Sequence, residues 1–149
     1  MIEINNLTTN PIEEDFLKKT ANLVLEKEGK KGFDLSIALV GRERIRTINK
    51  RYRGKNRATD VLAFPEVNIQ KEKFKIGPAE KSRGLGEIII CIREVKKNAK
   101  RMNLPFKKEL ATCLIHGILH LLGYDHEVNP EKAREMEERQ KYYLSRIFL

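Results

Sequence analysis

Three histidines in the last third of the chain have the residue type and spacing that metal chemistry requires. They are His116, His120 and His126, the only histidines present, in the order H-x-x-x-H-x-x-G-x-x-H. Residues four apart share one face of a helix, so the first two can present imidazole nitrogens to one ion. Gly123 can take the left-handed conformation that ends a helix, which lets the third histidine return to that ion. The spacing therefore predicts a site for one metal ion.

The donor set indicates the ion and its chemistry. Three neutral imidazoles suit zinc, whereas structural zinc sites usually fill all four positions with protein groups. A three-histidine site leaves the fourth position to water, whose pKa falls to about 7 on the metal. We therefore expect one Zn²⁺ held by three histidines and a water, in a catalytic site.

Gly117 restricts the reaction. Zinc peptidases with this histidine spacing carry their catalytic glutamate at that position, which here has no side chain. A phosphodiester fits better, because zinc and nearby arginines supply Lewis acidity and stabilise negative charge. Attack by zinc-bound hydroxide and attack by an RNA 2′-hydroxyl both stay open. Asp125 is a candidate catalytic base or an orienting group for a ligand, with a polar turn residue as the alternative.

The charge of the chain indicates an anionic partner. Lys and Arg number 30 against 21 Asp and Glu, for a formal net charge of +9. The excess is concentrated between residues 42 and 57, where Glu43 is the one acid. The cations of this segment are Arg42, Arg44, Arg46, Lys50, Arg51, Arg53, Lys55 and Arg57. Such a run attracts polyanions, and a solvated helix face is the alternative reading.

Length and hydropathy predict one domain over residues 1–149, since a chain of this size buries one substantial core. No apolar run approaches the roughly 20 residues that cross a bilayer, and the opening residues lack a leader pattern. We therefore expect a cytoplasmic protein without a membrane partner. Cys91 and Cys113 lie in apolar segments, which favours buried thiols over a disulfide.

Periodicity and helix signals predict an α+β fold, with a mixed sheet of three or four strands and about five helices. Asn10 and Asn129 precede prolines and are expected N-caps, and residues 66–83 have no clear pattern. The zinc site is expected at the end of a central core helix. Strands are expected at 2–7, 33–40, 61–64 and 84–92, and helices at 11–29, 41–53, 93–103, 106–123 and 129–149.

Three segments together resemble one known family. HGILHLLGYDH at 116–126, NKRYRGKNRATDVLAFP at 49–65 and GLGEIIIC at 84–91 occur in the order found in the YbeY family. Members of that family are bacterial metal-dependent endoribonucleases implicated in ribosomal RNA maturation and ribosome quality control. The resemblance covers residues 49–126. Two positions depart from the family pattern, with Ala63 in place of a serine and Glu87 in place of an aspartate.

The resemblance implies site residues and partners. It assigns the zinc ligands to the three histidines and points to Arg53 as the functional arginine, while Arg51, Lys55 and Arg57 are further candidates for RNA contact. It implies a single-stranded RNA substrate, action at the 3′ end of small-subunit ribosomal RNA, and the small ribosomal subunit as a partner.

Two other functions are weighed against this one. A zinc-stabilised ribosome assembly factor would bind RNA without cutting it. A metallopeptidase would need an unusual base, such as Asp125 or Glu127, and disagrees with the basic charge of the chain.

Overall fold

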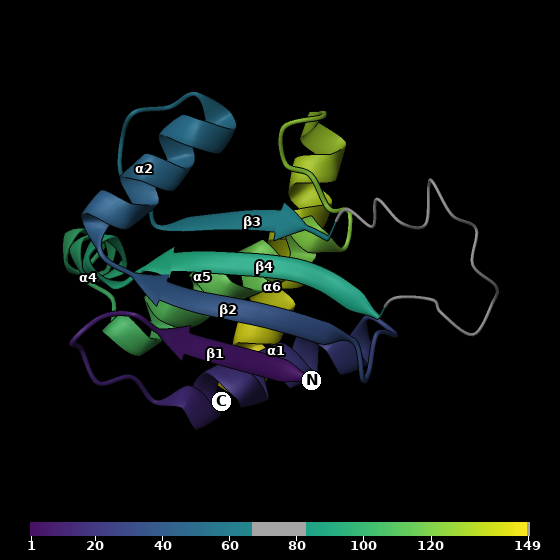
Figure 1. The fold of residues 1–149 in the computed structure, drawn as a ribbon. Helices are drawn as coiled ribbons and strands as arrows, with labels where there is room; N and C mark the ends of the chain where they lie inside the picture. Colours follow the sequence, from purple (N-terminus) through teal and green to yellow (C-terminus); the bar gives the residue numbers. More distant parts are fainter. Residues whose placement is uncertain (67–82, 149) are drawn as a thin grey trace, which may run out of the picture.

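A four-stranded mixed sheet organises the molecule (Figure 1). The computed structural model describes residues 1–66 and 83–148. The strand order is β1-β2-β4-β3, in which β1, β2 and β4 are parallel and β3 is antiparallel to β4. The strands are β1 (Ile2–Asn6), β2 (Asp34–Val40), β3 (Val61–Pro65) and β4 (Gly84–Cys91). All four correspond to strands expected from the sequence.

Alternation along the central strands separates two apolar clusters. Successive side chains of a strand point to opposite faces, so Ile88 and Ile90 of β4 join one cluster while Ile89 and Cys91 join the other. All four are almost completely buried. The unbroken apolar run in β4 therefore reflects burial on both faces of the sheet.

Helices cover both faces of the sheet (Figure 1). Helix α2 packs through Ile45 against the smaller cluster, and the other helices contribute to the larger one. Helix α5 lies at the centre, in contact with α1, α4, α6, β3 and β4. The helices are α1 (Glu14–Lys27), α2 (Arg42–Arg53), α4 (Ile92–Arg101), α5 (Phe106–Leu121) and α6 (Pro130–Ile147). The expected α+β class, mixed sheet and central core helix are confirmed, and the described residues contain five helices, as expected.

The two asparagines expected as helix caps have different roles. Asn129 caps α6, where its side chain accepts a hydrogen bond from the Lys132 amide at 2.8 Å. The prediction for Asn10 is wrong, because α1 begins at Glu14. The Asn10 carbonyl instead accepts a hydrogen bond from the Asn6 side chain at 2.7 Å, which holds residues 6–10 in a loop.

Both cysteines are free and buried, as expected. The expected irregular segment 66–83 lies mostly outside the described residues. Within the described ranges, no helix has the length and apolar character needed to span a membrane.

Candidate metal centre and cleft

The end of α5 positions the three histidines. His116 and His120 lie one turn apart in the helix, and the amides of Gly123 and Tyr124 then bond back to the carbonyls of His120 and Leu119. This paired pattern is the Schellman turn, which requires a left-handed residue. Gly123 provides it with a φ of 100°. The turn reverses the chain and brings His126 back to the helix end.

The three imidazole rings face one another closely enough to share an ion. Ring centroids are 5.3 Å apart for His116 and His120, 5.2 Å for His116 and His126, and 5.5 Å for His120 and His126. Their candidate ligand nitrogens all lie within 4.8 Å of one another, a spread that small ring rotations can close onto one metal ion. The donor set and the geometry both fit a three-histidine metal site.

Gln140 of α6 sets the orientation of His116. The Nδ1 atom of His116 lies 2.5 Å from Oε1 of Gln140, an oxygen that can only accept a hydrogen bond. Nδ1 therefore carries the proton, and Nε2 keeps its lone pair for a metal. Burial lowers the pKa of His116, which favours the neutral ring that metal ligation needs. Gln140 was not among the site residues predicted from the sequence, although it is a polar residue on the same helical stripe as buried Met136 and Tyr143.

Glu28, the C-cap of α1, anchors the turn that carries His126. One of its oxygens accepts a hydrogen bond from the Tyr124 hydroxyl at 2.8 Å, and the other accepts one from the Tyr143 hydroxyl. Arg139 forms an ion pair with the same carboxylate, with its guanidinium nitrogen 3.4 Å from a Glu28 oxygen. Because Tyr124 precedes His126 by two residues, this network fixes the turn to α1 and α6.

A cationic loop faces the histidines from the end of α2. Arg53 is the last residue of that helix. The next residue, Gly54, is the C-cap and has the left-handed conformation, with a φ of 71°. Buried Asn49 holds the following loop by donating to the Arg57 carbonyl at 2.9 Å, and the Lys55 amide donates back to the Asn49 carbonyl. The loop is thus held by hydrogen bonds to α2.

Arg53, Lys55 and Arg57 line the same cleft as the histidines, which has a volume of about 540 Å³. Arg51 does not line it and lies against the Tyr52 ring at 5.5 Å. Besides these cations and the three histidines, the polar residues that line the cleft are Thr59, Asp60, Glu109, Thr112, Cys113 and Glu127. Residues more than sixty positions apart therefore form one pocket, whose lining contains both cations and imidazoles.

Asp125 and Glu127 occupy different positions beside the third histidine. Asp125 accepts a hydrogen bond from the Glu127 amide at 2.8 Å and lines a separate hollow next to Tyr124. Glu127 lines the cleft, with a carboxylate oxygen 3.8 Å from Nε2 of His126. The structure thus places Asp125 as a turn residue, and its catalytic role stays a prediction.

Two acidic side chains, half-buried Asp60 and buried Glu109, also line the cleft. Asp60 and Glu109 lie 3.6 and 3.7 Å from the sulfur of Cys113. Burial raises the pKa of Glu109, and the nearby charge of Asp60 adds to that effect. Asp60 also accepts hydrogen bonds from the Val61 amide and the Asn98 side chain, so it joins β3 to α4. The sequence analysis assigned no role to Asp60 or Glu109, which come together only when β3 packs against α5.

Gly117 permits close packing between α5 and the sheet. A Cβ atom at this position would lie 3.1 to 3.3 Å from three side-chain atoms of Ile88 in β4. Ile88 is fully buried and has little freedom to move. The position that holds a glutamate in zinc peptidases is therefore directed against the sheet in this fold.

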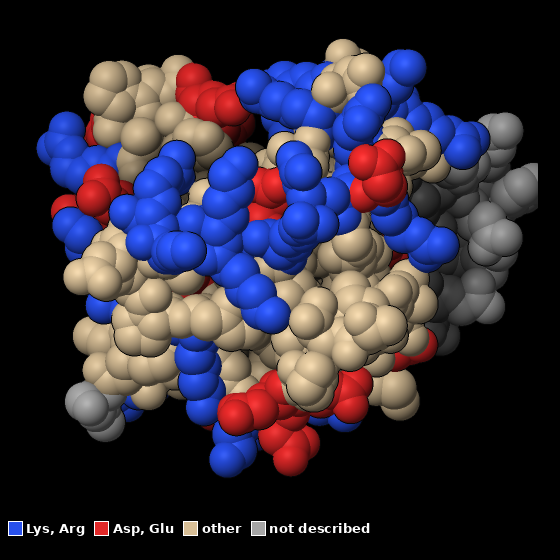
Figure 2. Space-filling view, turned by 90° about the vertical axis from the view of Figure 1, so that its left-hand side faces the viewer, with Lys and Arg blue, Asp and Glu red and all other residues tan. Residues whose placement is uncertain are grey.

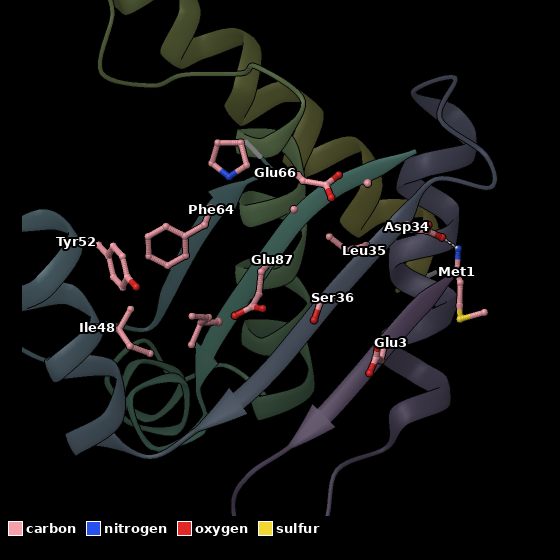
Figure 3. A pocket seen from close by; sticks show the side chains of 14 residues that line it. Met1, Glu3, Asp34, Leu35, Ser36, Ile48, Tyr52, Phe64, Glu66 and Glu87 are labelled. Carbon is pink, nitrogen blue, oxygen red and sulfur yellow. Dashed lines mark hydrogen bonds and ion pairs between the residues drawn. The ribbon is translucent and has the colours of Figure 1, made fainter. Parts of the chain in front are cut away.

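A larger hollow lies away from the metal centre (Figure 3). It has a volume of about 880 Å³, and its lining includes Tyr52, Phe64 and the carboxylates of Glu3 and Asp34. Glu87, one of the two departures from the family pattern, also faces this hollow. Ala63, the other departure, lines the metal cleft.

Fold and site together define an α+β protein with a three-histidine centre suited to one metal ion. A family model described as Endoribonuclease YbeY matches residues 3–148. The chain belongs to this family.

Named relatives and one solved structure agree with the assignment. Endoribonuclease YbeY of Sulfurihydrogenibium sp. (strain YO3AOP1) is 40% identical over 136 residues, which cover 91% of this chain and 84% of that protein. The protein of the same name from Bacillus subtilis (strain 168) is 38% identical over 140 residues, covering 91% and 88%. The solution structure of TM1509 from Thermotoga maritima is 34% identical, with a TM-score of 0.67 and coverage of 99% of this chain and 89% of that one.

Proposed function

We propose that this protein is a metal-dependent endoribonuclease that hydrolyses phosphodiester bonds of single-stranded RNA. The observation that carries the proposal is the cleft lined by three convergent histidines together with Arg53, Lys55 and Arg57. Hydrolysis of a phosphodiester needs positive charge beside its free oxygens and an activated nucleophile at phosphorus. The cations and the histidines of the cleft suit these two needs, and the relatives are named as endoribonucleases.

The residues of the chain divide the work between them. His116, His120 and His126 hold the ion, which we propose is zinc and which supplies Lewis acidity and acidifies water when bound. Arg53 binds the phosphate oxygens that gain charge during the reaction, because a guanidinium offers paired donors to a phosphate. Lys55 and Arg57 hold the RNA backbone on either side, and Arg51, outside the cleft, contacts RNA further along its path.

The proposed setting is ribosomal RNA maturation in the cytoplasm, with the 3′ end of small-subunit RNA as substrate and the small subunit as partner. An unpaired RNA segment can enter a narrow cleft that a duplex cannot, because its backbone is free to follow the cationic wall. The resemblance of three segments to the family supports this setting.

Cleavage of a labelled single-stranded ribosomal RNA fragment tests the proposal. Zinc-loaded protein is compared with His116→Ala, Arg53→Ala and Arg44→Ala, the last an exposed arginine of α2 that does not line the cleft. We expect His116→Ala to abolish cutting and Arg53→Ala to lower kcat/KM by about 100-fold, as for a lost transition-state donor. The Arg44 variant should cut like the unaltered protein.

Other outcomes would support the competing functions. If the His116→Ala protein folds, and both it and the unaltered protein bind RNA without cutting it, a non-catalytic assembly factor explains the site better. Hydrolysis of casein without hydrolysis of RNA would favour a peptidase. The packing of Gly117 against Ile88 argues against the peptidase, because it leaves no space for the usual glutamate.

A further inference from the structure

Helix α4 presents a second group of cations outside the cleft. Its exposed basic residues are Arg93, Lys96, Lys97, Lys100 and Arg101. Its single acid, Glu94, is paired with Arg42 of α2 at 2.6 Å. Among the described residues, none of the five cations makes an ion pair within 4.0 Å. The α4 face therefore carries an uncompensated positive charge.

Helix stability does not account for these charges. Arg93 with Lys97, Lys96 with Lys100, and Lys97 with Arg101 are like-charged pairs four residues apart, and such pairs destabilise a helix. Arg93 also lies in the first turn, where the helix dipole disfavours a cation. The dipole favours only Lys100 and Arg101, which lie in the last turn. A bound polyanion would instead be stabilised by all five charges.

The α4 face adjoins the metal cleft. The Asn98 side chain of α4 donates to Oδ2 of Asp60 at 3.3 Å, and Asp60 lines the cleft. Along the helix, Arg42 and Arg93 line a hollow together with Lys96, Lys97 and Lys100. Figure 2 shows a band of Lys and Arg side chains across the side of the molecule where α2 and α4 lie. The positive surface thus extends from the cleft along α4.

We propose that the α4 face, defined as Arg93, Lys96, Lys97, Lys100 and Arg101, binds the phosphate backbone of single-stranded RNA beyond the segment held in the cleft. This inference rests on the proposed endoribonuclease function. The helix is about 15 Å long, so its cations can contact several nucleotides of an extended strand. Exposed lysines and arginines of this kind bind backbone charge and not base sequence. One of them, Lys96, also lies 5.7 Å from the centroid of the Phe106 ring. The face increases affinity for long substrates and leaves the chemical step unchanged.

RNA binding by a triple variant tests the inference. Arg93→Gln, Lys97→Gln and Lys100→Gln are combined, and the control combines Lys18→Gln, Lys27→Gln and Lys31→Gln. The control lysines are exposed on or beside α1, and none of them lines the cleft or belongs to α4. Both variants lose three positive charges. Binding of a 20-nucleotide single-stranded RNA is measured by fluorescence anisotropy between 50 and 300 mM salt, with a buffer that contains no free metal.

We expect the α4 variant to bind the RNA about tenfold more weakly than the unaltered protein at 0.1 M salt. The slope of the logarithm of the binding constant against the logarithm of the salt concentration should become shallower by about 2, because each lost phosphate contact removes about 0.7. The control should keep the slope of the unaltered protein. Equal slopes and affinities for the two variants would overturn the inference and leave α4 as a solvated face.

Substrate length separates this inference from the proposed function. The zinc-loaded α4 variant should cut a five-nucleotide RNA at the rate of the unaltered protein. On the 20-nucleotide RNA it should show a raised KM and an unchanged kcat. A lower kcat on both substrates would contradict the inference. If the unaltered protein cuts neither RNA, the proposed function fails, while the salt dependence of binding still decides the role of α4.

Discussion

Gln140 determines which nitrogen of His116 is available to a metal. Its carboxamide oxygen accepts from Nδ1, so Nε2 is the nitrogen that keeps its lone pair for an ion. Groups that orient a metal-bound histidine in this way typically change metal affinity by 10- to 100-fold when they are removed.

We predict that Gln140→Leu weakens zinc binding by about 10- to 100-fold while the protein stays folded, because Leu keeps the size of the side chain and loses the acceptor. Competition with a fluorescent zinc chelator measures the affinity. Glu138→Leu, at an exposed position on the same helix, is the matched control. An unchanged affinity in the Gln140 variant would show that the ring needs no such support.

Glu109 gives the stability of the protein a defined pH dependence. Its raised pKa means that the folded state holds this proton more tightly than the unfolded chain does. The stabilising effect is therefore complete below about pH 4.5 and is lost as the pH rises through the folded pKa. Above that pKa, an ionised carboxylate is buried beside Asp60 and costs stability.

We predict that Glu109→Gln is more stable than the unaltered protein at pH 8, with a difference that shrinks as the pH falls toward 4. Gln keeps the shape of the side chain but cannot ionise. Urea unfolding across this range gives the free energy of unfolding, and Glu138→Gln provides an exposed control. A difference that grows toward low pH would contradict the assignment.

Residues of the site differ in how far the sequence alone could predict them. The three histidines and Gly123 are local, since helix periodicity and a turn bring them together within eleven positions. Gln140 lies 24 residues from His116, and the two meet only because α6 packs on α5. The pairing of Asp60 with Cys113 likewise spans 53 residues. Contacts of this kind depend on tertiary packing, which one sequence does not specify by spacing.

At the scale of elements, the contact between α5 and β4 places the metal centre. Gly117 lets the helix approach the sheet until Ile88 fills the space where a side chain would lie. The first two histidines sit on either side of this contact in sequence. A change in the distance between α5 and β4 would therefore move both His116 and His120.

We predict that Gly117→Ala lowers the free energy of unfolding by about 1 kcal/mol, because overpacking of the core outweighs the better helix propensity of alanine. Ile88→Val removes one of the contacting atoms, so Gly117→Ala should cost less in that background. Chemical denaturation of the single and double variants measures this coupling. A variant as stable as the unaltered protein would show that β4 can shift to accommodate the methyl group.

Elements with strong periodicity were predicted well, and their ends less well. The buried run of β4 and the capped start of α6 carry clear local signals. Asn10 carries the same cap signal, yet its carbonyl accepts a hydrogen bond from the Asn6 side chain and α1 begins only at Glu14. The neighbour relations in the sheet, with β4 between β2 and β3, were not predictable, because they depend on long-range strand pairing.

For the whole molecule, metal binding should stabilise the fold. The ligands come from α5 and the following turn, and Gln140 ties them to α6, so the unfolded chain lacks the arrangement that binds metal tightly. A ligand that binds only the folded state stabilises it by about 2.7 kcal/mol at 100 times its Kd.

We predict that zinc at 100 times its Kd raises the Tm of the protein by about 5 to 10 °C, as expected for a domain of this size. Differential scanning calorimetry with and without metal measures the shift. His120→Ala should lose most of it. A shift of equal size in that variant would place the bound ion elsewhere on the molecule.

The central claim is that one ion held by three histidines carries the cleavage of RNA. The most direct measurement titrates metal-free protein with zinc and follows single-turnover cutting of a labelled single-stranded RNA. We predict that the rate rises in proportion to added zinc and stops rising at one equivalent, and that His126→Ala shows no such rise. Full cutting by the metal-free protein, or cutting by His126→Ala that saturates at the same point, would contradict the claim.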